Sequence, residues 1–239
     1  MHADYGLDAP GAVRGFALAG GVCAVGAAAA GVAGVGDVTA VLVLGALMFI
    51  VAVALMVGSS RRGKLHEIQR MLDGLDLRGN EEVLDVGCGR GALLIAAARR
   101  VPRGRAVGVD VWADPHSGGS APAVALQNAR AEDVDDRVVV VEGDTRELPF
   151  PDASFDVVVS SIALHSLEAR DDRERACEEI ARVLRPGGRV ALLDFRGTHD
   201  CALALEDAGL GGVSRSGLRL SMYPPVRLVT ARKLPGAVA

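Results

Sequence analysis

From Glu82 onward, short runs of aliphatic residues alternate with stretches of helical composition. The aliphatic runs are EVLDVG, RAVGVDV, RVVVVEGD, FDVVVSS and RVALLDF. Each run is apolar almost without interruption, which is typical of parallel strands covered by helices on both faces. The alternation therefore predicts an α/β fold with a doubly wound, mostly parallel sheet.

Helices are expected between these runs, over about Gly91–Val101, Pro122–Ala131 and Asp172–Leu184, the last ended by Pro186-Gly187-Gly188. Near the C-terminus, a short helix around Ala202–Ala208 precedes two more strand-like runs, GVSRSGLRLSM and VRLVTARKL. Tyr223-Pro224-Pro225 separates these two runs. They predict a hairpin that completes a seven-stranded sheet with one antiparallel strand.

The first sixty residues differ in composition from the rest of the chain, because they contain two long uncharged stretches. Neither Gly15–Val35 nor Val38–Val57 carries a charge, and Asp37 separates them. As a helix, each stretch spans roughly 30 Å, the thickness of the bilayer hydrocarbon. We expect two transmembrane helices joined by a tight turn, with residues 1–62 as a membrane anchor and 63–239 as the α/β domain.

Two other interpretations of the first stretch are a cleaved signal peptide and a buried soluble helix. The leader contains acidic residues and only one arginine, which makes a poor signal sequence. A soluble helix would present a polar face, and none is visible. Arg14 precedes the first stretch and Arg61, Arg62 and Lys64 follow the second. Positive residues remain inside, so a multi-pass protein of the cell membrane with a cytoplasmic domain is expected.

The segment Lys64–Leu75 repeats apolar residues with helical spacing. It is expected to be a helix packed on the α/β domain, or alternatively one lying on the membrane surface. Only Gly58–Gly63 separates it from the second apolar stretch. So short a link would keep the domain at the bilayer.

Charge and cysteine content exclude several classes of function. The net charge is -4, so there is no basic face for nucleic acid. The four cysteines are far apart and form no CxxC pair. The sequence thus predicts neither a metal site nor a disulfide framework.

The first strand-like run leads into a glycine-rich turn, Gly87-Cys88-Gly89-Arg90-Gly91. A dinucleotide fingerprint would space its glycines as GxGxxG, whereas here they follow GxGxG. Asp85 lies two residues before the first glycine. A carboxylate at this point favours a ligand that carries an ammonium group.

The segment VLDVGCGRG resembles the first motif of the class I S-adenosylmethionine-dependent methyltransferases. LPFPDASFD, before the fourth run, is similar to the linker of their small-molecule branch, which includes quinone methyltransferases. VLRPGG matches the turn before that family's fifth strand. The resemblance covers roughly Leu65 to the C-terminus.

The resemblance implies S-adenosyl-L-methionine as cofactor. Asp110, after the second run, corresponds to the acid for the ribose hydroxyls, and Gly143-Asp144-Thr145 to the segment beside the adenine. The full set of implied cofactor-binding residues is Asp85, Gly87, Cys88, Gly89, Gly91, Asp110, Val111, Gly143, Asp144, Thr145 and Ser160.

Two departures narrow this expectation. Ser160-Ser161-Ile162-Ala163 stands where adenine and glutamine N-methyltransferases carry a proline–proline–aromatic motif. Those substrates are therefore not expected. The loop Val111–Ala121 is longer than a usual strand–helix link and holds the only tryptophan, Trp112. Trp112 either packs beside the adenine or belongs to a lid over the substrate.

Methyl transfer is a direct displacement that needs no metal, so the protein mainly positions and desolvates. A base is needed only if the acceptor loses a proton. His165, just beyond the fourth run, is the first candidate, and its alternative role is to order the loop. Asp194 and His199 are weaker candidates.

Three functions follow from these patterns. The first is a membrane-anchored methyltransferase acting on a small, possibly lipid-like acceptor. The second is a nicotinamide-dependent oxidoreductase on a similar sheet. The third is a membrane protein that binds S-adenosylmethionine without turnover. The acceptor atom and the oligomeric state stay open.

Overall fold

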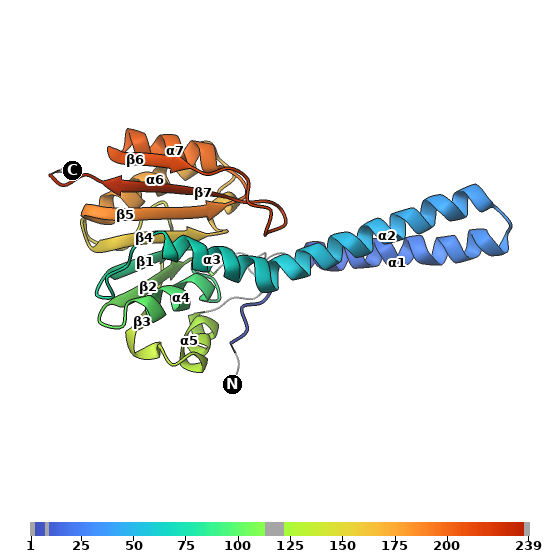
Figure 1. Cartoon of the computed structure of the whole chain (residues 1–239), viewed down its shortest axis with the longest axis horizontal. Helices are drawn as coiled ribbons and strands as arrows, with labels where there is room; N and C mark the ends of the chain where they lie inside the picture. Colours follow the sequence, from blue (N-terminus) through green and yellow to red (C-terminus); the bar gives the residue numbers. More distant parts are fainter. Residues whose placement is uncertain (1–2, 8–9, 113–121, 237–239) are drawn as a thin grey trace.

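A seven-stranded sheet forms the core of an α/β domain at one end of the molecule (Figure 1). The computed structural model describes residues 3–7, 10–112 and 122–236. The strands are β1 (Glu82–Val86), β2 (Arg105–Asp110), β3 (Val138–Glu142), β4 (Phe155–Ser161), β5 (Leu184–Asp194), β6 (Leu210–Arg215) and β7 (Arg227–Lys233). The helices of this domain are α3 (Lys64–Asp73), α4 (Ala92–Arg100), α5 (Pro122–Ala131), α6 (Arg170–Val183) and α7 (Thr198–Asp207).

The strand order is β3-β2-β1-β4-β5-β7-β6. Strands β1 to β5 pair in parallel, whereas β7 pairs antiparallel with both β5 and β6. The prediction of a seven-stranded sheet with one antiparallel strand is confirmed. The strand order reverses between β1 and β4, and such a reversal opens a crevice at the carboxyl ends of the strands.

Helices cover both faces of the sheet, because successive side chains of a strand point to opposite faces. Leu84 faces a core that contains residues of α6 and α7. Its neighbour Val83 faces a core that contains residues of α3 and α4. The doubly wound arrangement follows from strands that are apolar on both faces.

Several element boundaries were predicted wrongly; for example, the strand expected over 212–222 is β6, Leu210–Arg215. Strand β5 begins at Leu184 directly after α6, so Pro186-Gly187-Gly188 lies inside the strand instead of ending a helix. The β4–β5 register shifts between Phe155 and Val157, and this irregularity accommodates the proline and glycines. Helix α7 begins at Thr198, four residues before the predicted start, where Gly197 adopts a left-handed conformation.

Two long helices precede the domain and form an antiparallel hairpin (Figure 1). Helix α1 spans Pro10–Val32 and α2 spans Gly36–Gly58, so the first helix starts and ends earlier than the predicted 15–35 and the second is slightly longer than 38–57. They approach closely at small residues: a Cβ on Gly20 would lie 3.1 Å from Phe49 and one on Gly26 would lie 3.2 Å from Leu42. By length and composition, both helices could cross a membrane.

The short link between the hairpin and the domain is itself helical in the structure. A π-helical turn, Ser59–Gly63, joins α2 to α3 without a break. Tyr223 N donates to Ser59 Oγ at 2.8 Å, and a Cβ on Gly63 would lie 2.1 Å from the Ser221 carbonyl oxygen. The segment between β6 and β7 therefore fastens this turn to the domain.

Helix α3 packs on the domain, as its apolar spacing predicted. Ile68, Met71 and Leu72 are fully buried against residues of α4 and β1. Glu67 is buried as well, and it accepts hydrogen bonds from Arg219 Nη1 at 2.7 Å and from the Ser221 hydroxyl. These contacts make α3 part of the α/β domain.

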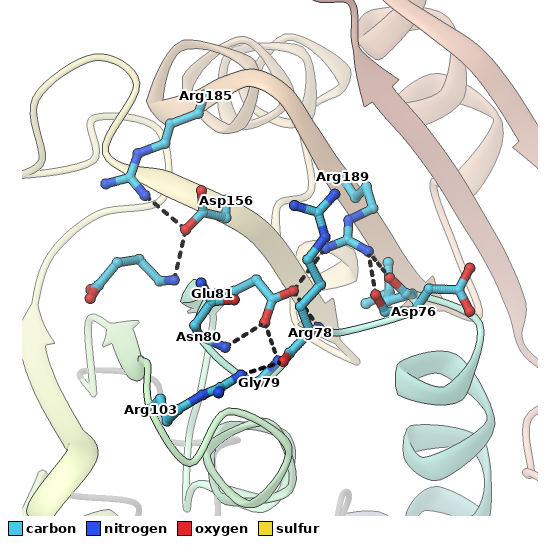
Figure 2. Close-up of polar contacts among 11 residues, drawn as sticks. Asp76, Arg78, Gly79, Asn80, Glu81, Arg103, Asp156, Arg185 and Arg189 are labelled. Carbon is cyan, nitrogen blue, oxygen red and sulfur yellow. Dashed lines mark hydrogen bonds and ion pairs between the residues drawn. The ribbon is translucent and has the colours of Figure 1, made fainter.

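The amino ends of the strands carry a network of paired charges (Figure 2). Glu81, which is buried, accepts a bond from Arg189 Nη2 at 3.2 Å, and Arg189 Nη1 donates to the Asp76 carbonyl at 3.0 Å. Asp156 accepts from Arg185 Nη1 at 2.7 Å. Glu81 also accepts three backbone N–H bonds, from Arg78, Gly79 and Asn80. This network ties the loop after α3 to β5.

Candidate active site

Two cavities lie at opposite ends of the sheet. One, of about 350 Å³, is at the amino ends and is lined by residues of the ion-pair network, including Glu81, Asp156 and Arg189. The other, of about 290 Å³, is at the carboxyl ends, beside the crevice between β1 and β4. Most of the sequence-predicted residues line the second cavity: Asp85, Gly87, Cys88, Gly89, Asp110, Val111, Asp144, Thr145 and His165.

The glycine turn passes very close to the loop after β4. Gly87 has φ +75°, and a Cβ on it would lie 2.2 Å from Ala163 Cβ. Gly87 N donates to the Val109 carbonyl at 2.8 Å, which ties the turn to β2. Gly91, at φ +86°, precedes the first residue of α4. Glycine is required at Gly87 by both backbone conformation and space.

Asp85 is buried beneath this turn and is only 1% exposed. Neither carboxylate oxygen has a hydrogen-bond partner among the described residues. Burial, with a smaller contribution from the charge of Asp110, raises the pKa of Asp85 to about 8. A buried carboxylate without a partner suits a cationic group on a ligand.

Asp110, at the end of β2, holds the glycine turn in place. Its Oδ2 accepts from Gly89 N at 2.8 Å, and its Oδ1 accepts from Trp112 N at 3.0 Å. Trp112 Nε1 donates back to the Gly89 carbonyl at 3.3 Å. Trp112 therefore packs against the turn. The lid that was considered for this loop falls on residues 113–121, outside the described residues.

Asp144 has a partner that the sequence did not predict. Arg146 Nη2 donates to Asp144 Oδ2 at 2.6 Å and Arg146 Nε donates to both oxygens. This hydrogen bonding lowers the pKa of Asp144. Arg146 lines the cavity, and only its short separation from Asp144 along the chain could have suggested the pair.

Three predicted residues lie outside the lining of the cavity. Ser160 is buried and donates to the Val86 carbonyl at 2.7 Å, whereas the next residue, Ser161, lines the cavity. Gly143 packs closely against Pro149, since a Cβ on Gly143 would lie 2.9 Å from the Pro149 ring. Gly91 serves the start of α4. Ser160 and Ser161 differ in this way because side chains alternate along β4.

His165 lines the cavity and lies beside Asp194 at the end of β5. His165 N donates to Asp194 Oδ2 at 3.1 Å, and His165 Nδ1 lies 3.2 Å from Asp194 Oδ1, without hydrogen-bond geometry. The imidazole ring also contacts Phe195, with ring centroids 4.4 Å apart. Asp194 thus holds the loop through the His165 backbone and lies beside the ring, so the two roles considered for His165 are compatible.

In the part of the chain that the structure describes, the buried side-chain atoms that lack a hydrogen bond all belong to this cavity. Among the described residues they are both oxygens of Asp85, Ser161 Oγ and His165 Nδ1. Proteins rarely leave such atoms unpaired, so each one needs an explanation. A polar ligand in the cavity supplies it. Burial raises the pKa of the Cys88 thiol well above its usual range.

The cavity has a wall that sequence reasoning missed. Tyr5 and Leu7, from the segment before α1, line it, as do Lys64 and Ile68 from α3. No periodicity or motif near the N-terminus indicates this. The cavity therefore lies at the base of the hairpin.

Comparison with known proteins bears on the reaction. Residues 84–192 match the methyltransferase domain family. Over 130 residues the chain is 45% identical to the 27-O-demethylrifamycin SV methyltransferase of Amycolatopsis mediterranei. The matched region covers 53% of this chain and 43% of that protein. Over 135 residues the chain is 36% identical to the ubiquinone/menaquinone biosynthesis C-methyltransferase of Dinoroseobacter shibae. This match covers 56% of this chain and 50% of that protein. The chain spans about half the length of these relatives or less.

Among solved structures, the [4+2]-cyclase SpnF is similar with a TM-score of 0.61 and 22% identity, over 74% of this chain and 83% of that one. At this identity the similarity shows the fold alone, and a fold does not decide a reaction. The sequence match is more specific. By that match, residues 84–192 are similar to methyltransferase domains.

Proposed function

We propose that the whole chain is a membrane-anchored methyltransferase that acts on a small, hydrophobic acceptor. The observation that carries the proposal is the set of unpaired buried polar atoms in one cavity: those of Asp85, Ser161 and His165. They lie at the crevice where a domain of this fold binds ligands. Nothing in a nicotinamide site calls for an unpaired buried carboxylate under the glycine turn.

In this proposal the cofactor lies over the glycine turn. The cofactor supplies an electrophilic methyl group. Gly87 and Gly89 let the backbone approach it, and Asp85 accepts its ammonium group. Asp110 is the acceptor for the ribose hydroxyls, since a carboxylate has two oxygens for a vicinal diol. Asp144, already paired with Arg146, borders the adenine with Gly143 and Thr145.

The acceptor is proposed to lie between the glycine turn and the loop after β4. Ser161 Oγ offers a buried hydroxyl to orient its polar group. His165 takes a proton when the acceptor atom must lose one, and Asp194 stabilises the protonated ring. Ile162, Ala163 and Leu167 complete an apolar wall. The relatives act on the molecules in their names, a rifamycin and a quinone precursor, and both indicate a small-molecule acceptor.

The hairpin supports the membrane part of the proposal. Large apolar side chains, such as Leu18, Val41 and Met48, are exposed along α1 and α2. Such a surface suits lipid. Arg14, in the second turn of α1, and Arg61, after α2, support a cytoplasmic side for the α/β domain in this proposal. We keep residues 1–62 as the anchor and 63–239 as the domain, with one continuous helix across the boundary.

A labelled-methyl transfer assay tests the function. Full-length protein in lipid nanodiscs is incubated with labelled S-adenosylmethionine and a membrane lipid extract or a soluble extract. We expect label in the lipid fraction, with the product then identified by mass. Label only in the soluble fraction would contradict the hydrophobic acceptor, and no label in either would contradict turnover.

A variant separates the roles of His165. His165→Gln should lower kcat by about 10²-fold or more if the ring acts as a general base. The affinity for S-adenosylhomocysteine should not change. An unchanged kcat would mean that His165 only orders the loop.

A further inference from the structure

The segment before the first helix, Ala3–Leu7, is fastened to the domain by one buried amide. Asn128, on α5, is 4% exposed. Asp4 N donates to Asn128 Oδ1 at 2.9 Å, and Asn128 Nδ2 donates to the Asp4 carbonyl at 3.0 Å. The same Nδ2 donates to the Arg90 carbonyl at 2.9 Å. Asn128 therefore joins the N-terminal segment to the glycine turn, far away in the sequence.

Arg90, which lies within the glycine turn, makes the second connection. Its Nε donates to the Asp4 carbonyl at 2.9 Å, and its Nη2 lies 2.8 Å from Asp4 Oδ2. Gly6 adopts φ +67° and a Cβ on it would lie 3.1 Å from Arg90 Cδ. Gly6 N donates to Asp4 Oδ1 at 2.9 Å, which closes a tight turn. The segment is thus shaped to fit Arg90.

The segment separates two spaces. Tyr5 and Leu7 line the cofactor cavity, and Tyr5 packs on the apolar cluster that contains Cys88 and Leu94. On its other side lies a cavity of about 460 Å³, lined by residues 3–7 and by Ser60, Arg61 and Leu65 at the base of the hairpin. The cofactor cavity itself, at about 290 Å³, is at the lower limit of the roughly 300–1,000 Å³ of ligand pockets. With the segment docked, Tyr5 and Leu7 form part of the wall of this small cavity.

We propose that residues 3–7 are a strap that holds the glycine turn in its cofactor-binding form and undocks when the cofactor exchanges. This inference rests on the proposed binding of S-adenosylmethionine over the turn. Asp4, Arg90 and Asn128 are positioning residues, and Tyr5 and Leu7 are part of the cavity wall. Only two residues separate Leu7 from Pro10, the first residue of α1. The hairpin therefore keeps the undocked strap close to its site.

The test measures dissociation of S-adenosylhomocysteine, which binds without reacting, from the full chain in nanodiscs. Asp4→Ala should speed dissociation by about 3–10-fold, because its ion pair is solvent-exposed but its Oδ1 also shapes the strap. Asn128→Ala should speed dissociation by about tenfold or more, because this substitution removes buried hydrogen bonds. Asp135→Ala is the matched control, since among the described residues this exposed carboxylate forms one ion pair, with Arg130 at 3.9 Å.

Two further variants distinguish a strap from general destabilisation. The effects of Arg90→Ala and Asp4→Ala should combine to less than their sum, since both remove the same ion pair while only Asp4→Ala removes the acceptor for Gly6 N. Asp4→Asn keeps the acceptor for Gly6 N and should restore slow dissociation in part. If Asn128→Ala lowers the melting temperature strongly, Asp4→Ala decides, because its side chain is 77% exposed.

The outcomes separate the strap from the function on which it rests. Dissociation from Asp4→Ala within about twofold of the wild-type rate, with tight wild-type binding, would overturn the strap alone. Failure of the wild-type chain to bind S-adenosylhomocysteine would overturn the proposed function and the strap with it. Faster dissociation in both variants, with Asp135→Ala unchanged, supports the strap.

Discussion

Glu81 precedes β1 and Asp85 lies near the carboxyl end of the same strand. Both carboxylates are buried, but Glu81 accepts hydrogen bonds from three backbone N–H groups and from Arg189, whereas Asp85 has no partner among the described residues. The pKa of Glu81 is lowered from its usual value despite burial, because these bonds favour the carboxylate. Burial, by contrast, raises the pKa of Asp85.

This difference in hydrogen bonding indicates that the two ends of the sheet have different roles. At the amino ends, each buried charge is neutralised within the protein, and the network fastens the loop after α3 to β5 (Figure 2). At the carboxyl ends, buried polar atoms are left for another molecule. Unpaired polar groups cost stability, so a fold concentrates them where they bind something. The predictions below test this contrast.

The largest effect is expected when alanine replaces Gly87. Gly187, which has a similar positive φ, is the control. Gly87→Ala should weaken S-adenosylhomocysteine binding by more than about 100-fold, because the new Cβ would lie 2.2 Å from Ala163 Cβ. Gly187, at φ +80°, has nothing within 4 Å of such a Cβ. Gly187→Ala should cost about 1–2 kcal/mol of stability and leave binding intact. Calorimetry and thermal melts check both, and equal binding losses would contradict a site at one end only.

The same acid-to-amide change should have opposite effects at the two ends. Glu81→Gln should lower the free energy of unfolding by about 3 kcal/mol, because it breaks a buried ion pair. Asp85→Asn should leave stability unchanged or increase it, since no partner is lost, but should weaken cofactor binding. Denaturant titrations at about pH 8.5, where Asp85 is charged, compare the two. A marked destabilisation by Asp85→Asn would mean that Asp85 has a structural partner.

The raised pKa of Asp85 predicts that cofactor affinity depends on pH. Below about pH 8 the free protein holds a proton on Asp85, and this proton must leave before the carboxylate pairs with an ammonium group. Affinity for S-adenosylhomocysteine should therefore fall as pH drops below 8, by up to about tenfold for each pH unit. Calorimetry in buffers of different ionisation enthalpy should detect the released proton. Asp85→Asn should remove the dependence, and a dependence that persists in this variant would assign it to another group.

The smallest effect distinguishes two adjacent serines. Ser160→Ala should cost about 1 kcal/mol, because the hydroxyl loses its bond to the Val86 carbonyl. Ser161→Ala should change stability by less than about 0.5 kcal/mol, because its hydroxyl has no partner to lose. Its effect should instead appear as a higher KM for the acceptor. Equal stability losses would show that Ser161 is also structural.

Much of the site could be placed from sequence because the parallel strands end at one edge. Asp85, Asp110 and His165 each follow or end a strand, so they meet at the same crevice once the strand order is known. The choice between Ser160 and Ser161 could not be made, because it depends on which face of β4 each residue occupies. A shift of one residue moves a side chain to the opposite face.

The order of strands and helices, the glycine turn and the apolar hairpin were determined by the sequence alone, because periodicity, turn chemistry and hydropathy act over short separations. Only the tertiary structure decided that Asn128 would hold Asp4 and that Asp194 would lie beside His165. These contacts join distant parts of the chain, and no local pattern encodes them. Polar groups buried by folding find partners wherever the fold brings one within reach.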